Sequence, residues 1–130
     1  WPLVAVEVPN PHAVVFVDEL ADAGSLIVAP EVRPSGTFPT GVNIEFVVDL
    51  GPDHVGIRVH ERGVGETQSC GTGACAVAWA KARRRGEPVL PVTTLVDVPG
   101  GQLRVTESTE GHLLLTGPAD LVARGSVLLP

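Results

Sequence analysis

Cys70 is the residue best placed for chemistry in this 130-residue sequence, because it stands directly before Gly71-Thr72-Gly73 and an alanine-rich segment. A thiol at the start of a helix lies close to unpaired backbone N–H groups, which lower its pKa and favour the thiolate. Glycines beside it let a ligand approach those N–H groups, which can also hold a carboxylate or a phosphate. The pattern therefore predicts a reactive sulfur next to an anion-binding loop. The alternative is that Cys70 is only a small buried residue.

Other chemistries fit the same stretch less well. A phosphate-binding Walker loop would have Lys-Ser or Lys-Thr after its second glycine, where this sequence has Ala74-Cys75. Zinc normally needs more ligands than two cysteines and four scattered histidines supply, so no metal site is expected. A disulfide between Cys70 and Cys75 is not expected, because five helical residues turn the chain by roughly 500°. Cys75 is assigned to the core, and a cysteine hydrolase with Cys70 as nucleophile stays open.

Composition argues against several classes of partner. Hydrophobic residues make up 44% of the chain, yet no apolar run reaches the roughly 18 residues that a membrane-spanning helix requires. The net charge is −6 and the only basic cluster is Arg83-Arg84-Arg85, which argues against a nucleic-acid partner. Two cysteines without a disulfide framework favour a reducing compartment, and so the cytoplasm. The opening Trp1-Pro2, without a start methionine or a secretory pattern, predicts a fragment or processed chain that begins inside a strand.

Short runs typical of β-strands alternate with turn residues along the chain. These runs cover 3–8, 13–17, 42–50, 55–61, 93–98, 102–108 and 112–116. Because 15 glycines and 12 prolines punctuate the sequence, we expect a β-rich, mostly antiparallel domain. Residues 18–33 predict one short helix before Pro34.

The segment 72–86 carries the one strong helix signal. Its many alanines have the highest intrinsic helix propensity. Every side chain from 74 to 80 is apolar or small, which predicts burial on all sides. The basic residues that follow, including Arg85, suit the negative end of the helix dipole, and Gly86 predicts the end of the helix. The sequence therefore predicts one buried helix wrapped by strands, with its N-terminus facing outward or into a cleft.

Several motifs, in their order along the chain, resemble the diaminopimelate epimerase family. They are Asn10-Pro11-His12, Gly41-Val42-Asn43, ERGVGET at 61–67, CGTGAC at 70–75, Pro99-Gly100-Gly101 and LTGPA at 115–119. Proline racemases resemble the cysteine loop but lack ERGVGET, and phenazine-biosynthesis isomerases share the fold without the cysteine. The resemblance covers nearly the whole chain but only the C-terminal half of the usual enzyme. It implies an α+β fold, a mostly antiparallel β-barrel wrapped around one buried central helix, with residues 1–130 as the C-terminal domain.

The activity that the resemblance implies is a cofactor-independent epimerisation, which interconverts LL- and meso-2,6-diaminopimelate on the path to lysine and peptidoglycan. Without pyridoxal phosphate as an electron sink, preorganised donors must stabilise the carbanion formed at the α-carbon. A thiol and a thiolate on opposite faces of that carbon would transfer the proton, and Cys70 resembles one of them. The other belongs to an N-terminal Cys-Gly-Asn-Gly motif that this sequence lacks. The chain alone is therefore expected to be inactive, with the substrate and the N-terminal half as partners, and full-length chains are expected to form a homodimer.

The resemblance also implies roles for individual residues. His12 would help to set the protonation of the thiols, and Glu61 would pair with the thiol of Cys70. The expected substrate-binding residues are Asn10, Asn43, Glu61, Arg62, Gly71 and Thr72. Among them, Arg62 would grip the distal carboxylate of the substrate, whereas Gly71 and Thr72 would donate backbone N–H groups to its α-carboxylate. Because neighbours on a strand face opposite sides, a bend at Gly63 is needed to bring both Glu61 and Arg62 into the site.

The remaining polar residues receive simpler interpretations. His54, His60 and His112 match no motif and are expected on the surface, and Glu66-Thr67 is expected to shape the loop before Cys70. Two function classes stay open: one half of an epimerase, or a cysteine-dependent hydrolase or anion- or amino-acid-binding module on the same fold. An acyl adduct on Cys70 would favour the hydrolase, whereas solvent deuterium entering the α-position of diaminopimelate would favour the epimerase.

Overall fold

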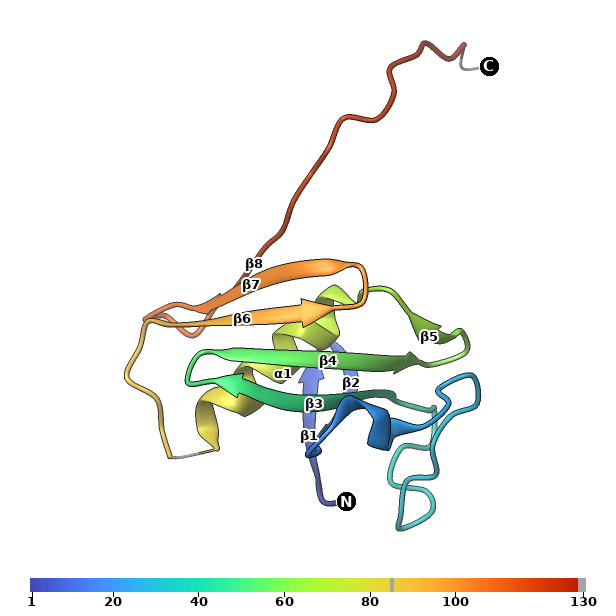
Figure 1. Cartoon of the computed structure of the whole chain (residues 1–130), viewed down its shortest axis with the longest axis vertical. Helices are drawn as coiled ribbons and strands as arrows, with labels where there is room; N and C mark the ends of the chain where they lie inside the picture. Colours follow the sequence, from blue (N-terminus) through green and yellow to red (C-terminus); the bar gives the residue numbers. More distant parts are fainter. Residues whose placement is uncertain (85, 129–130) are drawn as a thin grey trace.

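Eight strands form one curled sheet around a single α-helix in the computed structural model, which describes residues 1–84 and 86–128 (Figure 1). The strands are β1 (Leu3–Val8), β2 (Asn10–Phe16), β3 (Asn43–Gly51), β4 (His54–Glu61), β5 (Gly65–Thr67), β6 (Val92–Val98), β7 (Gly101–Glu107) and β8 (Leu113–Thr116). The α-helix α1 spans Gly71–Arg83, and a one-turn 3-10 helix, η1, spans Leu20–Ala23. The predicted α+β class is confirmed, and the short helix expected within 18–33 is reduced to η1.

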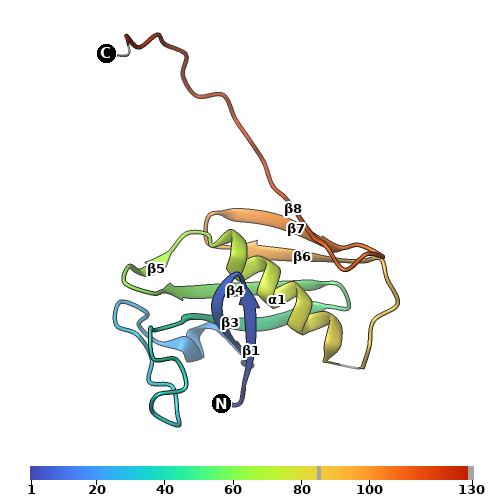
Figure 2. The ribbon, with the colours of Figure 1, turned by 180° about the vertical axis from the view of Figure 1, so that it is seen from behind.

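The sheet is mostly antiparallel but contains two parallel pairs. Its order is β1-β2-β3-β4-β6-β7-β8, with β5 paired to β4, and the parallel pairs are β2 with β3 and β4 with β6. The view from behind shows α1 lying across the concave side of the sheet (Figure 2). Among the described residues β1 and β8 are not paired with each other, so the sheet is a half-barrel rather than a closed barrel. After β8 the chain extends away from the body (Figure 1).

The helix α1 begins where the sequence predicts and ends slightly earlier. Cys70 is its N-cap and Arg84 its C-cap, followed by Gly86 with a φ of 113°, while Arg85 lies outside the described residues. Its buried residues are Gly73, Ala74, Cys75, Ala76, Val77, Ala78 and Ala80. Small side chains on every side of the helix let the curled sheet pack closely around it. At 13 residues α1 is too short to cross a bilayer, and no other helix in the described ranges could do so.

Both faces of the central strands are covered, which explains their continuous apolar runs. The inner face packs Val14, Val47 and Ile57 against α1, and Cys75 lies in the same core, as predicted. On the outer face, Phe46 and its neighbours pack against Leu26, which belongs to the segment between β2 and β3. The sheet is therefore the middle layer between α1 and the 18–42 segment.

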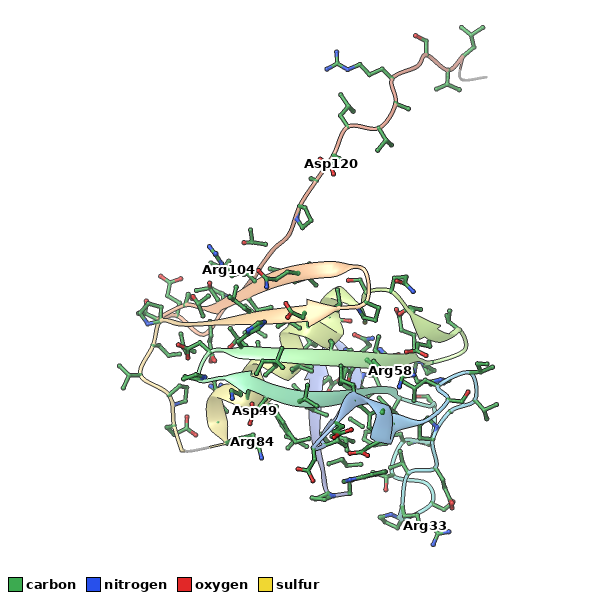
Figure 3. The ribbon with its side chains drawn as sticks, in the orientation of Figure 1. Arg33, Asp49, Arg58, Arg84, Arg104 and Asp120 are labelled. Carbon is green, nitrogen blue, oxygen red and sulfur yellow. The ribbon has the colours of Figure 1, made fainter. Side chains whose placement is uncertain are left out.

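Ion pairs attach the C-terminal part of α1 to the sheet. Lys81 and Arg84 both donate to the carboxylate of Asp49 at the end of β3, with an Arg84 Nη1 to Asp49 Oδ2 distance of 2.6 Å. Figure 3 shows Asp49 and Arg84 side by side below β3. Arg83 donates two hydrogen bonds to the buried Glu107 of β7, at 2.8 and 2.7 Å. The guanidinium group thus compensates a carboxylate that would otherwise be costly to bury.

Acid should weaken this last pair in a predictable pH range. The hydrogen bonds from Arg83 lower the pKa of Glu107 below its ordinary value of 4.5. A carboxyl group with a lowered folded-state pKa contributes stability above its unfolded value, and that contribution is lost as the pH falls through the folded value. We expect the free energy of unfolding to drop between about pH 5 and pH 3, and the drop to be smaller in Glu107→Gln. Urea unfolding of both proteins across this range measures the difference, and equal drops would contradict the assignment.

Candidate active site

The candidate site lies where three strands and the helix meet at one end of the concave face. β2 and β3 run parallel and both begin there, β4 ends there, and α1 starts beside them. The ladder pairs His12 with Asn43 and Val14 with Glu45, and paired residues share a face of the sheet. The same alternation brings Glu61, the last residue of β4, to this face. Residues that are far apart in the sequence, from His12 to Cys70, therefore lie together at this end of the concave face.

His12 is fully buried and holds two polar partners. Its Nδ1 lies 2.6 Å from Glu45 Oε1, and its Nε2 lies 3.1 Å from Asn10 Oδ1. Because the Asn10 oxygen accepts a hydrogen bond, Nε2 carries a hydrogen atom. Burial raises the pKa of Glu45, and the hydrogen bond with His12 opposes this increase. Histidine 12 therefore has a fixed orientation at the start of β2.

Glu45 was missed by the sequence reasoning. It stands in the apolar run IEFVV of β3, a pattern that predicts only a strand, and its side chain is fully buried. A signal was available, because Glu45 has the same alternation phase as Asn43, which was already assigned to the site. A charged residue in the inward phase of a buried strand needs a polar partner, and His12 supplies it.

Cys70 is buried at the N-cap of α1, with 7% of its surface exposed. Its Sγ accepts a hydrogen bond from the Gly73 N–H at 3.4 Å and lies 3.6 Å from Thr72 Oγ1. Burial raises the pKa of Cys70 above its ordinary value, and the hydrogen bonds from Thr72 and Gly73 oppose this. Glu61 and Glu45 add to the increase in pKa, since a thiolate would be repelled by their charges. The lowered pKa predicted from the helix terminus is therefore wrong, and the thiol form is favoured at neutral pH.

The first turn of α1 retains donors for an anion. Gly73 donates its N–H to Cys70 Sγ, and Ala74 donates to Cys70 O at 2.9 Å. The N–H groups of Gly71 and Thr72 precede the first intrahelical hydrogen bonds and have no partner among the described residues. Both residues are half-buried. The two residues predicted to bind a carboxylate are thus those whose donors remain available.

Glu61 reaches the site, whereas the Arg62 guanidinium does not. Thr67 Oγ1 donates to Glu61 Oε1 at 2.5 Å, and the Arg62 backbone N–H donates to Asn43 Oδ1 at 2.8 Å. The predicted bend is present, since Gly63 has a φ of 77° in the turn after β4. The exposed Arg62 side chain nevertheless lies on the other side, where its Nη1 donates to Thr40 O at 3.0 Å. The alternation of side chains along a strand explains this separation.

Of the three histidines expected on the surface, His60 contradicts the expectation. It is buried, and its Nδ1 donates to Leu26 O at 2.7 Å, because the 18–42 segment covers the outer face of β4. His112 is exposed, and His54 is half-buried with its Nε2 2.8 Å from Asp97 Oδ2.

Glu66 and Thr67 make contacts within the sheet, to Arg58 and to Glu61, and their expected role in shaping the loop before Cys70 stays a prediction. The pair between Glu66 and Arg58 holds β5 against β4, and Arg58 also donates to carbonyl groups of the segment 20–24.

No group of three or more His, Cys, Asp or Glu side chains that could hold a metal ion occurs in the part of the chain that the structure describes.

The comparison with protein families is decisive. A model of the diaminopimelate epimerase family matches residues 4–122. A diaminopimelate epimerase of Streptomyces coelicolor is 57% identical over 129 residues, which cover 96% of this chain and 45% of that relative. The chain belongs to the diaminopimelate epimerase family. A second diaminopimelate epimerase, from Alkalilimnicola ehrlichii, is 43% identical over 98% of this chain and 45% of its own length. The chain thus spans about half the length of the curated relatives that it matches.

Solved structures support the fold. A protein named as a phenazine biosynthesis PhzC/PhzF protein, from Clostridium difficile (strain 630), superposes with a TM-score of 0.50 over 77% of this chain and 35% of that one. Because the sequence identity is only 18%, this similarity concerns the fold and not the chemistry. The comparison therefore supports the fold of this chain alone.

Proposed function

We propose that this chain is the C-terminal half of a diaminopimelate epimerase, which interconverts LL- and meso-2,6-diaminopimelate without pyridoxal phosphate. The observation that carries the proposal is the position of Cys70, which caps α1 next to the available N–H groups of Gly71 and Thr72. The same loop can hold the substrate α-carboxylate and present a sulfur to the adjacent α-carbon. The 57% identity to a diaminopimelate epimerase over 96% of the chain supports this choice of substrate.

The proton transfer follows from these positions. A thiolate in the N-terminal half takes the α-proton from one face, and the Cys70 S–H delivers its proton to the opposite face of the same carbon. The product then leaves with Cys70 as thiolate and the other cysteine as thiol, so protons and charge balance, and the reverse reaction exchanges these roles. The raised pKa of Cys70 suits the proton-donating role, since burial keeps the sulfur protonated before the reaction. The N–H groups of Gly71 and Thr72 stabilise the negative charge that develops on the carboxylate.

Asn10 and Asn43 contribute their amide N–H₂ groups. Their side-chain oxygens are engaged inside the chain, by His12 Nε2 and by the Arg62 backbone N–H. Each amide group therefore presents hydrogen-bond donors to the substrate rather than an acceptor. Donors of this kind suit the two carboxylates of diaminopimelate. To bind the distal carboxylate, the Arg62 guanidinium has to leave Thr40 O, which is a surface rearrangement of one exposed side chain.

A cysteine-dependent hydrolase is less well supported. Such an enzyme needs a histidine that takes the proton of the thiol. In the described residues both nitrogens of His12 are engaged, by Glu45 and by Asn10, and neither forms a hydrogen bond with Cys70. The raised pKa of Cys70 also disfavours an attacking thiolate.

Both cysteines are free, which fits the cytoplasm as the place of synthesis of the lysine and peptidoglycan precursor.

Hydrogen exchange at the α-carbon tests this proposal. LL-diaminopimelate is incubated in deuterated water with this chain alone, and with the chain plus a separately supplied N-terminal half. We expect deuterium incorporation only after the two halves are combined, because one cysteine cannot serve both faces of the carbon. Absence of exchange in a complex of confirmed stoichiometry and fold would reject the epimerase, and an acyl adduct on Cys70 would favour the hydrolase.

A further inference from the structure

Glu45 is a buried acid that takes no part in the proton transfer proposed above. Its side chain is fully buried in β3, and its Oε1 lies 2.6 Å from His12 Nδ1. Its other oxygen, Oε2, has no hydrogen-bond partner among the described residues. A fully charged carboxylate in such a place is costly, because one of its oxygens is neither solvated nor hydrogen-bonded.

The carboxyl group of Glu45 and the sulfur of Cys70 border the same small space at the start of α1. A Cβ atom added to Gly73 would lie 2.8 Å from Glu45 Oε1 and 3.2 Å from Cys70 Sγ. Both groups therefore lie next to the Cα atom of Gly73, where any larger residue would press against both. The charge of Glu45 also helps to raise the pKa of Cys70, although burial has the largest effect and the charge of Glu61 contributes more than that of Glu45.

Few other charges compete at this position. The titratable groups that face Glu45 are His12 on β2, Glu61 on β4 and Cys70 at the start of α1. No lysine or arginine forms an ion pair with Glu45 in the described ranges. The charge on Glu45 is therefore balanced by His12 alone.

Two arrangements of one proton satisfy these contacts. Since His12 Nε2 already carries the hydrogen atom that Asn10 accepts, a second proton lies in the bond between Nδ1 and Oε1. It belongs either to an imidazolium next to a carboxylate or to a carboxylic acid next to an imidazole. The two forms have the same net charge, and the contact of 2.6 Å between Nδ1 and Oε1 fits either of them.

We propose that Glu45 is a positioning residue for the cysteine chemistry, which holds His12 in the Nε2–H orientation and, with the shared proton, controls when Cys70 loses its own proton. The role in catalysis rests on the proposed function, but the coupling between Glu45, His12 and Cys70 is a property of this chain alone. When Cys70 becomes a thiolate, the charge of Glu45 opposes it directly. A proton retained on the His12–Glu45 pair reduces this repulsion.

Glu45→Gln tests the coupling without a substrate. Glutamine keeps the size of the side chain and can still bond His12 Nδ1, but it carries no charge and no acidic proton. In a Cys75→Ala background, alkylation of Cys70 by iodoacetamide is followed by mass spectrometry as a function of pH. We expect the midpoint of the profile to move to lower pH by a small amount, so that the thiolate fraction at pH 7 rises about twofold, because the charge of Glu45 is the smallest of the contributions that raise the pKa of Cys70. A loosening that exposed Cys70 would also lower the midpoint, because burial raises the pKa of this thiol, but it would in addition accelerate alkylation at high pH, where the thiolate is fully formed. An unchanged alkylation rate at high pH therefore separates the loss of charge from a loosening of the structure.

Glu107→Gln is the matched control. It removes another buried glutamate charge, but Glu107 pairs with Arg83 near the C-terminal end of α1. At a pH where this variant is folded, its Cys70 profile should coincide with that of the parent protein. An unchanged midpoint in folded Glu45→Gln would overturn the proposal, as would an equal change in Glu107→Gln.

A second measurement applies if Glu45→Gln does not fold. In the unmodified chain, the NMR signals of the Glu45 carboxyl carbon and of the Cys70 Cβ atom should change together over one pH range, because coupled groups titrate as a pair. Separate transitions would overturn the proposal. If the alkylation profile shifts but diaminopimelate shows no exchange in the reassembled enzyme, the coupling stands and the epimerase assignment fails. If both hold, the pH profile of α-proton exchange in Glu45→Gln should move in the same direction as the alkylation profile.

Discussion

Replacing Cys70 by alanine should reduce α-proton exchange of diaminopimelate by about a thousandfold or more in the reassembled enzyme, because acid–base groups in contact with the reacting carbon contribute factors of about 10² to 10⁴. Among the described residues His12 is not free to replace this proton donor, since its two ring nitrogens are engaged by Glu45 and Asn10. Deuterium incorporation measured by NMR gives the rate constants of both proteins. The fold should persist, because alanine still fits the buried N-cap position, although the loss of the Gly73 N–H acceptor costs about 1 kcal/mol of stability.

Cys75→Ala is the control for this result. Cys75 lies in the hydrophobic core between α1 and the sheet, and burial raises its pKa as well. It is an equally buried thiol on the same helix, but its side chain lies on another side of the helix from the site. We expect its exchange rate to stay within about threefold of the parent protein, since only a small core side chain is shortened. Equal losses in both variants would show that neither sulfur acts as the acid and that the variants report packing.

Much of the site could be predicted from short motifs, because its donors belong to local structure. The start of α1 at Gly71 follows from the glycines and alanines around Cys70, and the available N–H groups follow from any helix start. The alternation of β3 and β4 also explains why Asn43 and Glu61 meet. These features depend on periodicity and on chain order, which the sequence displays directly.

The properties that depend on packing could not be predicted. The pKa of Cys70 was expected to fall because the helix terminus was considered alone, whereas burial, which has the largest effect, comes from segments far away in the sequence. His60 was expected on the surface because nothing in its own strand indicates that the segment around Leu26 covers it. The alternation phase shared with Asn43 indicates the inward direction of Glu45, but its partner His12 lies on another strand, 33 residues away in the sequence. The local sequence indicates one effect on the pKa of a side chain, and the tertiary structure determines which of several effects is largest.

Gly73→Ala should destabilise the protein although alanine favours helices. The substitution gains about 1 kcal/mol of helix propensity. The new Cβ, however, would lie 2.8 Å from Glu45 Oε1 and 3.2 Å from Cys70 Sγ. The carboxyl group can move away only by breaking its bond to the buried His12, and an unpaired buried polar group costs about 1–3 kcal/mol. We expect a net loss of about 1–2 kcal/mol in the free energy of unfolding, measured by urea denaturation. Exchange of diaminopimelate should fall about ten- to a hundredfold, because Cys70 is displaced from the α-carbon.

Gly71→Ala separates this steric effect from helix propensity. Gly71 is in the same first turn, but its added Cβ would meet only Leu115 Cδ2, at 3.1 Å. Leu115 is exposed at 46% and can turn toward solvent, so little opposes the gain in propensity. The free energy of unfolding of Gly71→Ala should therefore equal or exceed that of the parent protein. If Gly73→Ala were also neutral or stabilising, the carboxyl group of Glu45 would have to move freely under the helix. A fixed His12–Glu45 pair beside Cys70 would then be excluded, because a rigid pair cannot make room for an additional methyl group.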